Sequence, residues 1–224
     1  MRQSCTTKLF YNKYIYKLRI KNSIATIFRG MNLRYAKSKL DEMQMAAESD
    51  LPIPSPFSLG LREPRTIPLD VFMDACVMYN HLEKNKKRCM VRCEGHCLDI
   101  YSNEKEWLLD LAKYVNAVEF FQPEESFTEF LKNNVNVVIS TAPVEYPYKV
   151  YFNSYANKNF ADYCKNNPSI KIGKTALEHV AKEWYLQGFY FWVKTEKQLM
   201  LAKIALGTGI SKVVKYVSAD DLHK

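Results

Sequence analysis

The sequence predicts an α+β protein made of two tandem β-α-β-β-α-β units, and two internal similarities support this prediction. Residues 14–20 (YIYKLRI) reappear as residues 146–152 (YPYKVYF), and an Asn-Ser pair follows each copy within two residues. Residues 103–109 (NEKEWLL) reappear in the same order as residues 195–201 (TEKQLML). Two matched pairs in one order suggest a duplication, and an internal repeat constrains the whole fold.

The composition supports a globular chain. Of the 224 residues, 47% are hydrophobic and 13% aromatic, which is enough to build a core. No apolar run approaches the roughly 18 residues that span a bilayer, and the start of the chain lacks a secretory signal pattern. The six cysteines have no regular spacing. They fit free thiols, so we expect a location in the cytoplasm or another reducing intracellular compartment, without membrane partners.

The first element is a strand at residues 14–21, because apolar and basic residues alternate there. The apolar face carries Tyr14, Tyr16, Leu18 and Ile20, and the basic face carries Lys13, Lys17, Arg19 and Lys21. A helix is expected over about residues 23–48. Five prolines between residues 50 and 68 then exclude a regular helix or a central strand.

A helix beginning at Pro68 follows, and we interpret residues 50–87 as an insertion in the first unit. Residues 89–101 predict a hairpin that turns at Glu94 and Gly95. Ser102 or Asn103 caps the next helix, and residues 117–121 form the closing strand. The first unit is therefore expected over residues 1–122, basic and with this insertion.

Residues 123–144 are expected to connect the two units. A helix is predicted at 124–131 and an apolar strand at 135–140, as a linker hairpin or a sheet extension. The second unit then occupies residues 145–224. Its predicted strands are 147–153, 170–172, 188–194 and 210–217, and its predicted helices are 157–166, 174–185 and 196–206. Both units follow the ferredoxin-like strand and helix order.

Positive charge is concentrated at the start of the chain. The net charge is +8, and residues 1–40 contain ten Lys or Arg and no Asp or Glu. The remaining residues contain 22 basic and 24 acidic side chains. Such clustering is typical of a surface for polyanions, most commonly nucleic acid. A solvated basic face and an organelle transit peptide are alternatives, although residues 14–20 match a sequence deep inside the chain.

The alternation also predicts which side chains are accessible, because helices cover one face of a ferredoxin-like sheet and leave the other open. In the first unit the open strand face carries Lys17, Arg19 and Lys21, with Arg29 and Arg34 nearby. In the second unit the same register turns Lys149 and Tyr151 outward. Aligning the third strands through the matched Glu-Lys pairs turns Phe189 and Phe191 outward as well. We expect these nine residues to bind nucleic acid.

Residues 188–193 (GFYFWV) resemble the aromatic third-strand motif of RNA-recognition domains, and residues 150–153 (VYFN) resemble their first-strand motif. The sequence departs from the motif at Gln187, where a basic residue is usual, and at Tyr190, where a small one is usual. The resemblance implies that bases stack on exposed rings, at about 1–3 kcal/mol per base. Alternatively, these aromatics pack against the other unit or against residues 123–141.

Candidate catalytic and metal sites are weak. Cys89, Cys93, His96 and Cys97 are closely spaced, but the hairpin turns Cys97 away from the core face that holds Cys89 and Cys93. We therefore expect buried thiols, with no metal and no cofactor. A His-x-His pair, a nucleophile elbow and a phosphate loop are all missing from the sequence.

These observations favour a non-enzymatic protein that binds single-stranded RNA or DNA. The main alternative is a structural or assembly subunit of a nucleoprotein or virus-type particle, which would use the same surfaces for protein contacts. Tandem ferredoxin-like units are also similar to CRISPR RNA-processing endoribonucleases, which use general acid-base catalysis. Residues 207–209 (GTG) are shorter than the glycine-rich loop of that family, so this enzyme is the least favoured alternative.

Overall fold

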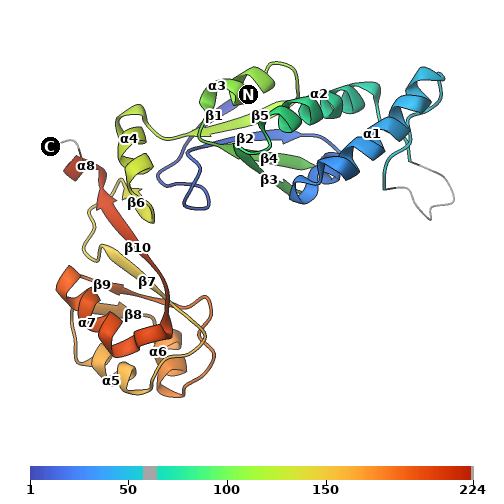
Figure 1. Cartoon of the computed structure of the whole chain (residues 1–224). Helices are drawn as coiled ribbons and strands as arrows, with labels where there is room; N and C mark the ends of the chain where they lie inside the picture. The colour runs from blue at the N-terminus through green and yellow to red at the C-terminus, as the bar shows by residue number, and fades with distance from the viewer. Residues whose placement is uncertain (58–64, 223–224) are drawn as a thin grey trace. The chain divides into compact units, whose positions relative to one another are not determined.

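The computed structural model describes residues 1–57 and 65–222, and its fold is mixed α+β (Figure 1). The chain divides into two compact units. The first unit contains residues 1–6 and 10–128, and the second contains residues 7–9 and 129–224. Each unit has its own five-stranded sheet. In the described ranges, no helix has both the length and the apolar character needed to cross a bilayer.

The described residues of the first unit form five strands, a 3-10 helix and three α-helices. The strands are β1 (Arg2–Cys5), β2 (Tyr16–Lys21), β3 (Cys89–Glu94), β4 (Cys97–Ser102) and β5 (Ala117–Gln122). The helices are η1 (Ala25–Met31), α1 (Leu33–Glu48), α2 (Leu69–Asn85) and α3 (Lys105–Leu111). Helix α4 (Glu125–Asn133) spans the division between the units.

The second unit also contains five strands. These are β6 (Val137–Ser140), β7 (Tyr148–Phe152), β8 (Ile170–Ile172), β9 (Tyr190–Val193) and β10 (Ile210–Ser218). Its helices are α5 (Asn159–Lys165), α6 (Lys174–Ala181), α7 (Glu196–Leu206), η2 (Gly207–Gly209) and α8 (Ala219–Leu222).

The two sheets have the same strand order. The first runs β1-β5-β2-β4-β3, and the second runs β6-β10-β7-β9-β8, so adding five to each label of the first sheet gives the second. In each sheet the edge strand β1 or β6 is parallel to its neighbour. Every other pair of neighbouring strands is antiparallel. This correspondence agrees with the order of the internal similarities in the sequence.

Apolar side chains of β2 and β7 anchor the two cores. Leu18 lies opposite Ile100 and Phe120, and all three are fully buried under the helices of the first unit. Val150 lies opposite Phe191 and Val213 in the second unit. Val150 therefore has the same place in its sheet as Leu18, as the similarity between residues 14–20 and 146–152 indicates.

The prediction of which side chains of strand β9 point outward was wrong. Phe191 is 0% exposed in the core of the second unit, and Phe189 is half-buried against that core. Strand pairing equates Ile100 with Phe191, whereas the matched Glu-Lys pairs equated it with Trp192. A one-residue slip moves every side chain of a strand to the other face. Tyr190 and Trp192 are consequently the outward residues.

Three other elements differ from expectation. The helix predicted over residues 23–48 is interrupted at Arg29 and Gly30, where Gly30 has φ +65°, so it forms η1 and α1 instead. Strand β1 was not predicted. The hairpin pairs Glu94 with Cys97, two residues out of the expected register. An even shift preserves the faces, so Cys93 still points toward the core.

Candidate nucleic-acid interface

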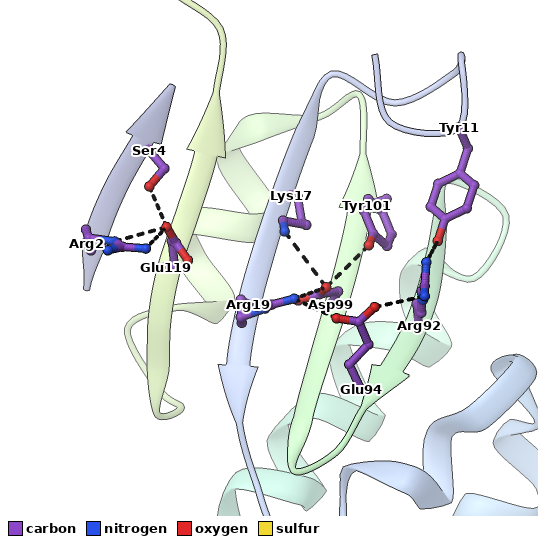
Figure 2. Close-up of polar contacts among 10 residues, drawn as sticks. All are labelled: Arg2, Ser4, Tyr11, Lys17, Arg19, Arg92, Glu94, Asp99, Tyr101 and Glu119. Carbon is purple, nitrogen blue, oxygen red and sulfur yellow. Dashed lines mark hydrogen bonds and ion pairs between the residues drawn. The ribbon is translucent and has the colours of Figure 1, made fainter. Parts of the chain in front are cut away.

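A buried carboxylate organises the face of the first sheet that is turned away from the helices (Figure 2). Asp99 is 2% exposed. The Arg19 guanidinium donates from Nε to Asp99 Oδ1 at 2.6 Å and from Nη2 to Asp99 Oδ2 at 2.7 Å. The Lys17 ammonium lies 3.9 Å from Asp99 Oδ2, and the Tyr101 hydroxyl donates a hydrogen bond to the same oxygen at 3.4 Å. Lys17 and Arg19, two of the charges predicted to meet phosphate, are thus paired within the protein.

Two further carboxylates pair with cations on the same face (Figure 2). Glu119 accepts hydrogen bonds from Ser4 and Arg2, and these bonds lower its pKa below the usual range. Glu94 pairs with Arg19 at 3.1 Å and with Arg92 at 2.9 Å. The strands β1 to β5 carry five basic and three acidic residues in all. Each of these three acidic residues pairs with a basic residue on this face.

Residues 10–14 cover part of this face. The Lys17 ammonium lies 3.5 Å from the centre of the Phe121 ring and 5.5 Å from that of Phe10. Phe10 and Tyr11 also contact the ring of Tyr101, at 5.4 and 5.0 Å between centroids. Burial lowers the pKa of Lys17, against the opposing effect of Asp99. Lys17 is only 8% exposed, so its ammonium is largely withdrawn from solvent.

The other predicted basic residues of the first unit do not share one surface. Lys21 is exposed at the end of β2. Arg29 and Arg34 are exposed on η1 and α1. Those elements pack into the core on the opposite side of the sheet from the Asp99 network. The basic start of the chain is therefore divided between two faces.

The outward face of the second sheet has a different character. Lys149 Nζ lies 3.7 Å from the ring centre of Tyr190, 5.1 Å from that of Tyr151 and 5.3 Å from that of Trp192. The rings of Tyr151 and Tyr190 are 5.7 Å apart across the strand pair. Trp192 contacts Tyr216 at 5.0 Å, which extends the aromatic surface to β10. We call Lys149, Tyr151, Tyr190, Trp192 and Tyr216 the aromatic face.

Carboxylates are missing from the strands that carry the aromatic face. Strands β6 to β10 contain four lysines and no Asp or Glu. Within the part of the chain that the structure describes, Lys149, Lys171 and Lys212 have no carboxylate oxygen within 4.0 Å. The first compact unit contains 18 basic and 16 acidic residues. The second contains 14 basic and 8 acidic residues. The excess positive charge therefore lies mainly in the second unit.

Two hollows border Trp192. One, of about 280 Å³, is lined by Ser140, Pro143, Val144, Glu145, Tyr146, Lys171, Trp192 and Tyr216. The other, of about 350 Å³, is lined by residues of β8, the first turn of α6 and β9. Both include Lys171, which places a cation at the edge of each hollow.

The cysteine-rich hairpin forms part of the core of the first unit. Cys89 donates a hydrogen bond to the carbonyl of Asn85 at 3.3 Å, and Cys93 donates to that of Ala25 at 3.2 Å. Burial raises the pKa of Cys89 to about 11. Among the described residues, no three His, Cys, Asp or Glu side chains are placed to hold a metal ion.

Of the predicted site residues, the structure brings Lys149 and Tyr151 together on the aromatic face. It buries Phe191 and half-buries Phe189. Sequence reasoning missed Tyr190, Trp192, Tyr216, Lys171 and Lys212. The alternation in β9 was visible, but only its pairing with β7 fixes which residues point outward. Comparisons with protein-family models, curated proteins and solved structures give no significant match.

Proposed function

We propose that the chain is a non-enzymatic protein that binds single-stranded RNA or DNA on the aromatic face of its second unit. The observation that carries the proposal is Lys149, a lysine among three aromatic rings on strands without carboxylates. Bases stack on exposed rings regardless of sequence, and lysines attract the phosphates between them. This combination favours unpaired bases, because a duplex keeps its bases stacked internally.

In this proposal Lys149, Lys171 and Lys212 contact phosphates, and Tyr151, Tyr190 and Trp192 stack bases. Lys21, Arg29 and Arg34 are exposed and stay candidates for further phosphate contacts. Lys17 and Arg19 are left out, because each already pairs with Asp99. Moving Arg19 toward a phosphate would break both of its hydrogen bonds to the buried Asp99 carboxylate and leave Lys17, 3.9 Å away, as the cation beside it.

We also propose that both units are ferredoxin-like. The antiparallel orders β5-β2-β4-β3 and β10-β7-β9-β8 support this assignment, since each places the first and third strands of a β-α-β-β-α-β unit at the centre. Strands β1 and β6 would then be edge additions, and α6 an extra helix. The central position of β7 and β9 is what puts Tyr151 beside Tyr190.

The test is a fluorescence-anisotropy titration of single-stranded RNA and DNA oligomers at two salt concentrations. We expect binding that weakens as salt rises, and an affinity reduced about 5- to 150-fold by Tyr190→Ala, the loss of one stacked base. Tyr35→Ala is the matched control, because Tyr35 is 42% exposed on α1 and Tyr190 is 40% exposed. An absence of binding at low salt would refute the proposal. The RNA should remain intact, and cleavage would favour the endoribonuclease alternative.

One observation supports a second candidate, an assembly subunit. Helix α7 exposes Met200, Leu201 and Ile204, at 61%, 41% and 78%. Exposed apolar groups of this kind mark protein interfaces when they are contiguous. Sedimentation velocity separates the candidates. Self-association that Ile204→Glu abolishes, together with no affinity for nucleic acid, would favour assembly.

A further inference from the structure

The larger hollow exists because strand β8 is short. Its three residues pair with β9 only from Val193 to Phe191. Among the described residues, no strand covers residues 188–190 on that side of β9. The resulting hollow measures about 350 Å³, and its lining includes Lys171, Lys174, Phe189, Tyr190 and Trp192. Small-molecule sites typically begin at about 300 Å³, so a nucleotide-sized group fits.

Aromatic contacts continue beyond the hollow, away from the aromatic face. The Phe189 ring, which lines the hollow, lies 4.7 Å from the His179 imidazole. His179 in turn meets the Trp184 indole edge to face at 5.3 Å. Trp184 is 51% exposed. Contacting rings therefore lead from Phe189 at the hollow, through His179, to an accessible indole.

The loop that carries Trp184 is held in place. The backbone N–H of Trp184 donates to the carbonyl of His179 at 2.8 Å, and a ring nitrogen of His179 lies 2.9 Å from the carbonyl oxygen of Tyr185. Leu186 is fully buried, and its backbone N–H donates to the carbonyl of Ser154 at 2.9 Å. The indole is consequently presented from a fixed loop, which reduces the entropy lost when a ligand binds.

Positive charge follows the same path. Lys171 and Lys174 line the hollow, and Lys182 Nζ lies 4.4 Å from the Trp184 ring centre. In residues 1–57 and 65–222, none of these three ammonium groups has a carboxylate oxygen within 4.0 Å. Lysines interleaved with rings match the alternation of phosphates and bases in a single strand.

We propose that a single strand bound on the aromatic face continues around the β8 edge, through the hollow, and stacks a further base on Trp184. The inference rests on the proposed function and extends it to a longer binding site. The second unit would then hold two stacking positions, one at Tyr190 and Trp192 and the other at Trp184. Affinity should depend on strand length, because a short oligomer reaches only one of them.

The experiment compares oligomers of about 4 and about 12 nucleotides, within the range of single-strand sites. Trp184→Ala should weaken binding of the longer oligomer about 5- to 150-fold and leave the shorter one unchanged. Trp184→Phe, which keeps a ring, should restore most of the affinity. Trp107→Phe is the control, because Trp107 is half-buried in the first unit and hydrogen-bonded to Ser102.

A second readout does not rely on the alanine variant folding. The double variant Trp107→Phe with Trp192→Phe leaves Trp184 as the sole tryptophan. Its fluorescence should be quenched by the longer oligomer and not by the shorter one. Equal effects of Trp184→Ala on both lengths, or no effect on either while Tyr190→Ala still weakens binding, would overturn the inference and spare the proposed function. No binding of either oligomer by the unmodified protein would refute both the inference and the proposed function.

Discussion

Lys17 and Lys149 have equivalent places in the two sheets and both lie over aromatic rings, but only Lys17 pairs with a carboxylate. Strand pairing puts Asp99 and Glu119 beside Arg19 in the first sheet, and puts Tyr190 and Lys212 beside Tyr151 in the second. The same backbone arrangement therefore supports one face whose charges are internally paired and another whose strands carry lysines and aromatic rings without carboxylates. The second sheet has Tyr190 and Lys212 where the first has Asp99 and Glu119, and this exchange accounts for much of the difference in charge between the two faces.

The segments that lead into the two central strands strengthen this contrast. Residues 10–14 place Phe10 and Tyr11 over the first sheet, where they help to bury Lys17. Before β7, Glu145 and Tyr146 instead border a hollow beside Trp192. The outward face of the first sheet is partly covered by its own chain. That of the second sheet leaves Tyr190 40% exposed.

The largest expected effect comes from breaking the first network. Asp99→Asn removes the carboxylate shared by Lys17 and Arg19 and should lower the free energy of unfolding by about 3–5 kcal/mol, because a buried cation loses its partner. Chemical denaturation measures the change. Asp162→Asn is the matched control, since Asp162 is 74% exposed and pairs with Lys165. A loss of less than about 1 kcal/mol would mean that the network contributes little.

Transplanting the first network into the second sheet should abolish its proposed role. Tyr151→Arg with Tyr190→Asp recreates the pair formed by Arg19 and Asp99, and we expect single-strand affinity to fall by at least about 1–3 kcal/mol, the value of one stacked base. Tyr151→Phe with Tyr190→Phe keeps both rings and should retain affinity. Unchanged binding by the Arg and Asp variant would place the binding site elsewhere.

Acid should weaken the interactions that Glu119 makes with Arg2 and Ser4. Its pKa is lowered in the folded protein, so the unfolded chain binds the proton more readily. The stabilisation is complete above the unfolded pKa of about 4.3 and is lost as pH falls through the lower folded value. Glu119→Gln should cost about 1 kcal/mol at neutral pH and make the decline below about pH 4.3 shallower. Urea unfolding across this range is the measurement, with exposed Glu129→Gln as control.

The smallest effect concerns the lysines around the aromatic face. Each phosphate contact contributes about 0.7 to the slope of log affinity against log salt for a single strand. Lys212→Gln should therefore flatten the slope by about 0.7. Lys203→Gln, which removes an exposed charge from α7, should leave it unchanged. If both variants behave alike, Lys212 does not contact phosphate.

Local patterns predicted most of the elements and missed the long-range ones. Alternation located β2 and β7, and the prolines correctly separated α1 from α2. The four-residue strand β1 has little pattern of its own, and it pairs with β5, where Arg2 lies opposite Glu119. That partner is 117 residues away. Strand β1 therefore forms only through pairing with a distant segment, which a local sequence pattern does not reveal.

The candidate site was harder to predict for the same reason. The ten basic residues at the start suggested a polyanion surface, but Asp99, far along the chain, pairs with two of them. The outward residues of β9 depended on a register that the Glu-Lys similarity misplaced by one residue. Charge and aromatic content were evident in the sequence. Which charges are paired and which rings are exposed followed only from strand pairing.

The first nine residues have a consequence for synthesis. Arg2–Cys5 form an edge strand against β5, and the carbonyl of Thr7 accepts a hydrogen bond from Ile139 at 2.8 Å, beside β6. This segment is synthesised before its partners, which lie more than a hundred residues further along the chain. Completing either sheet requires closing a very long loop, which slows folding.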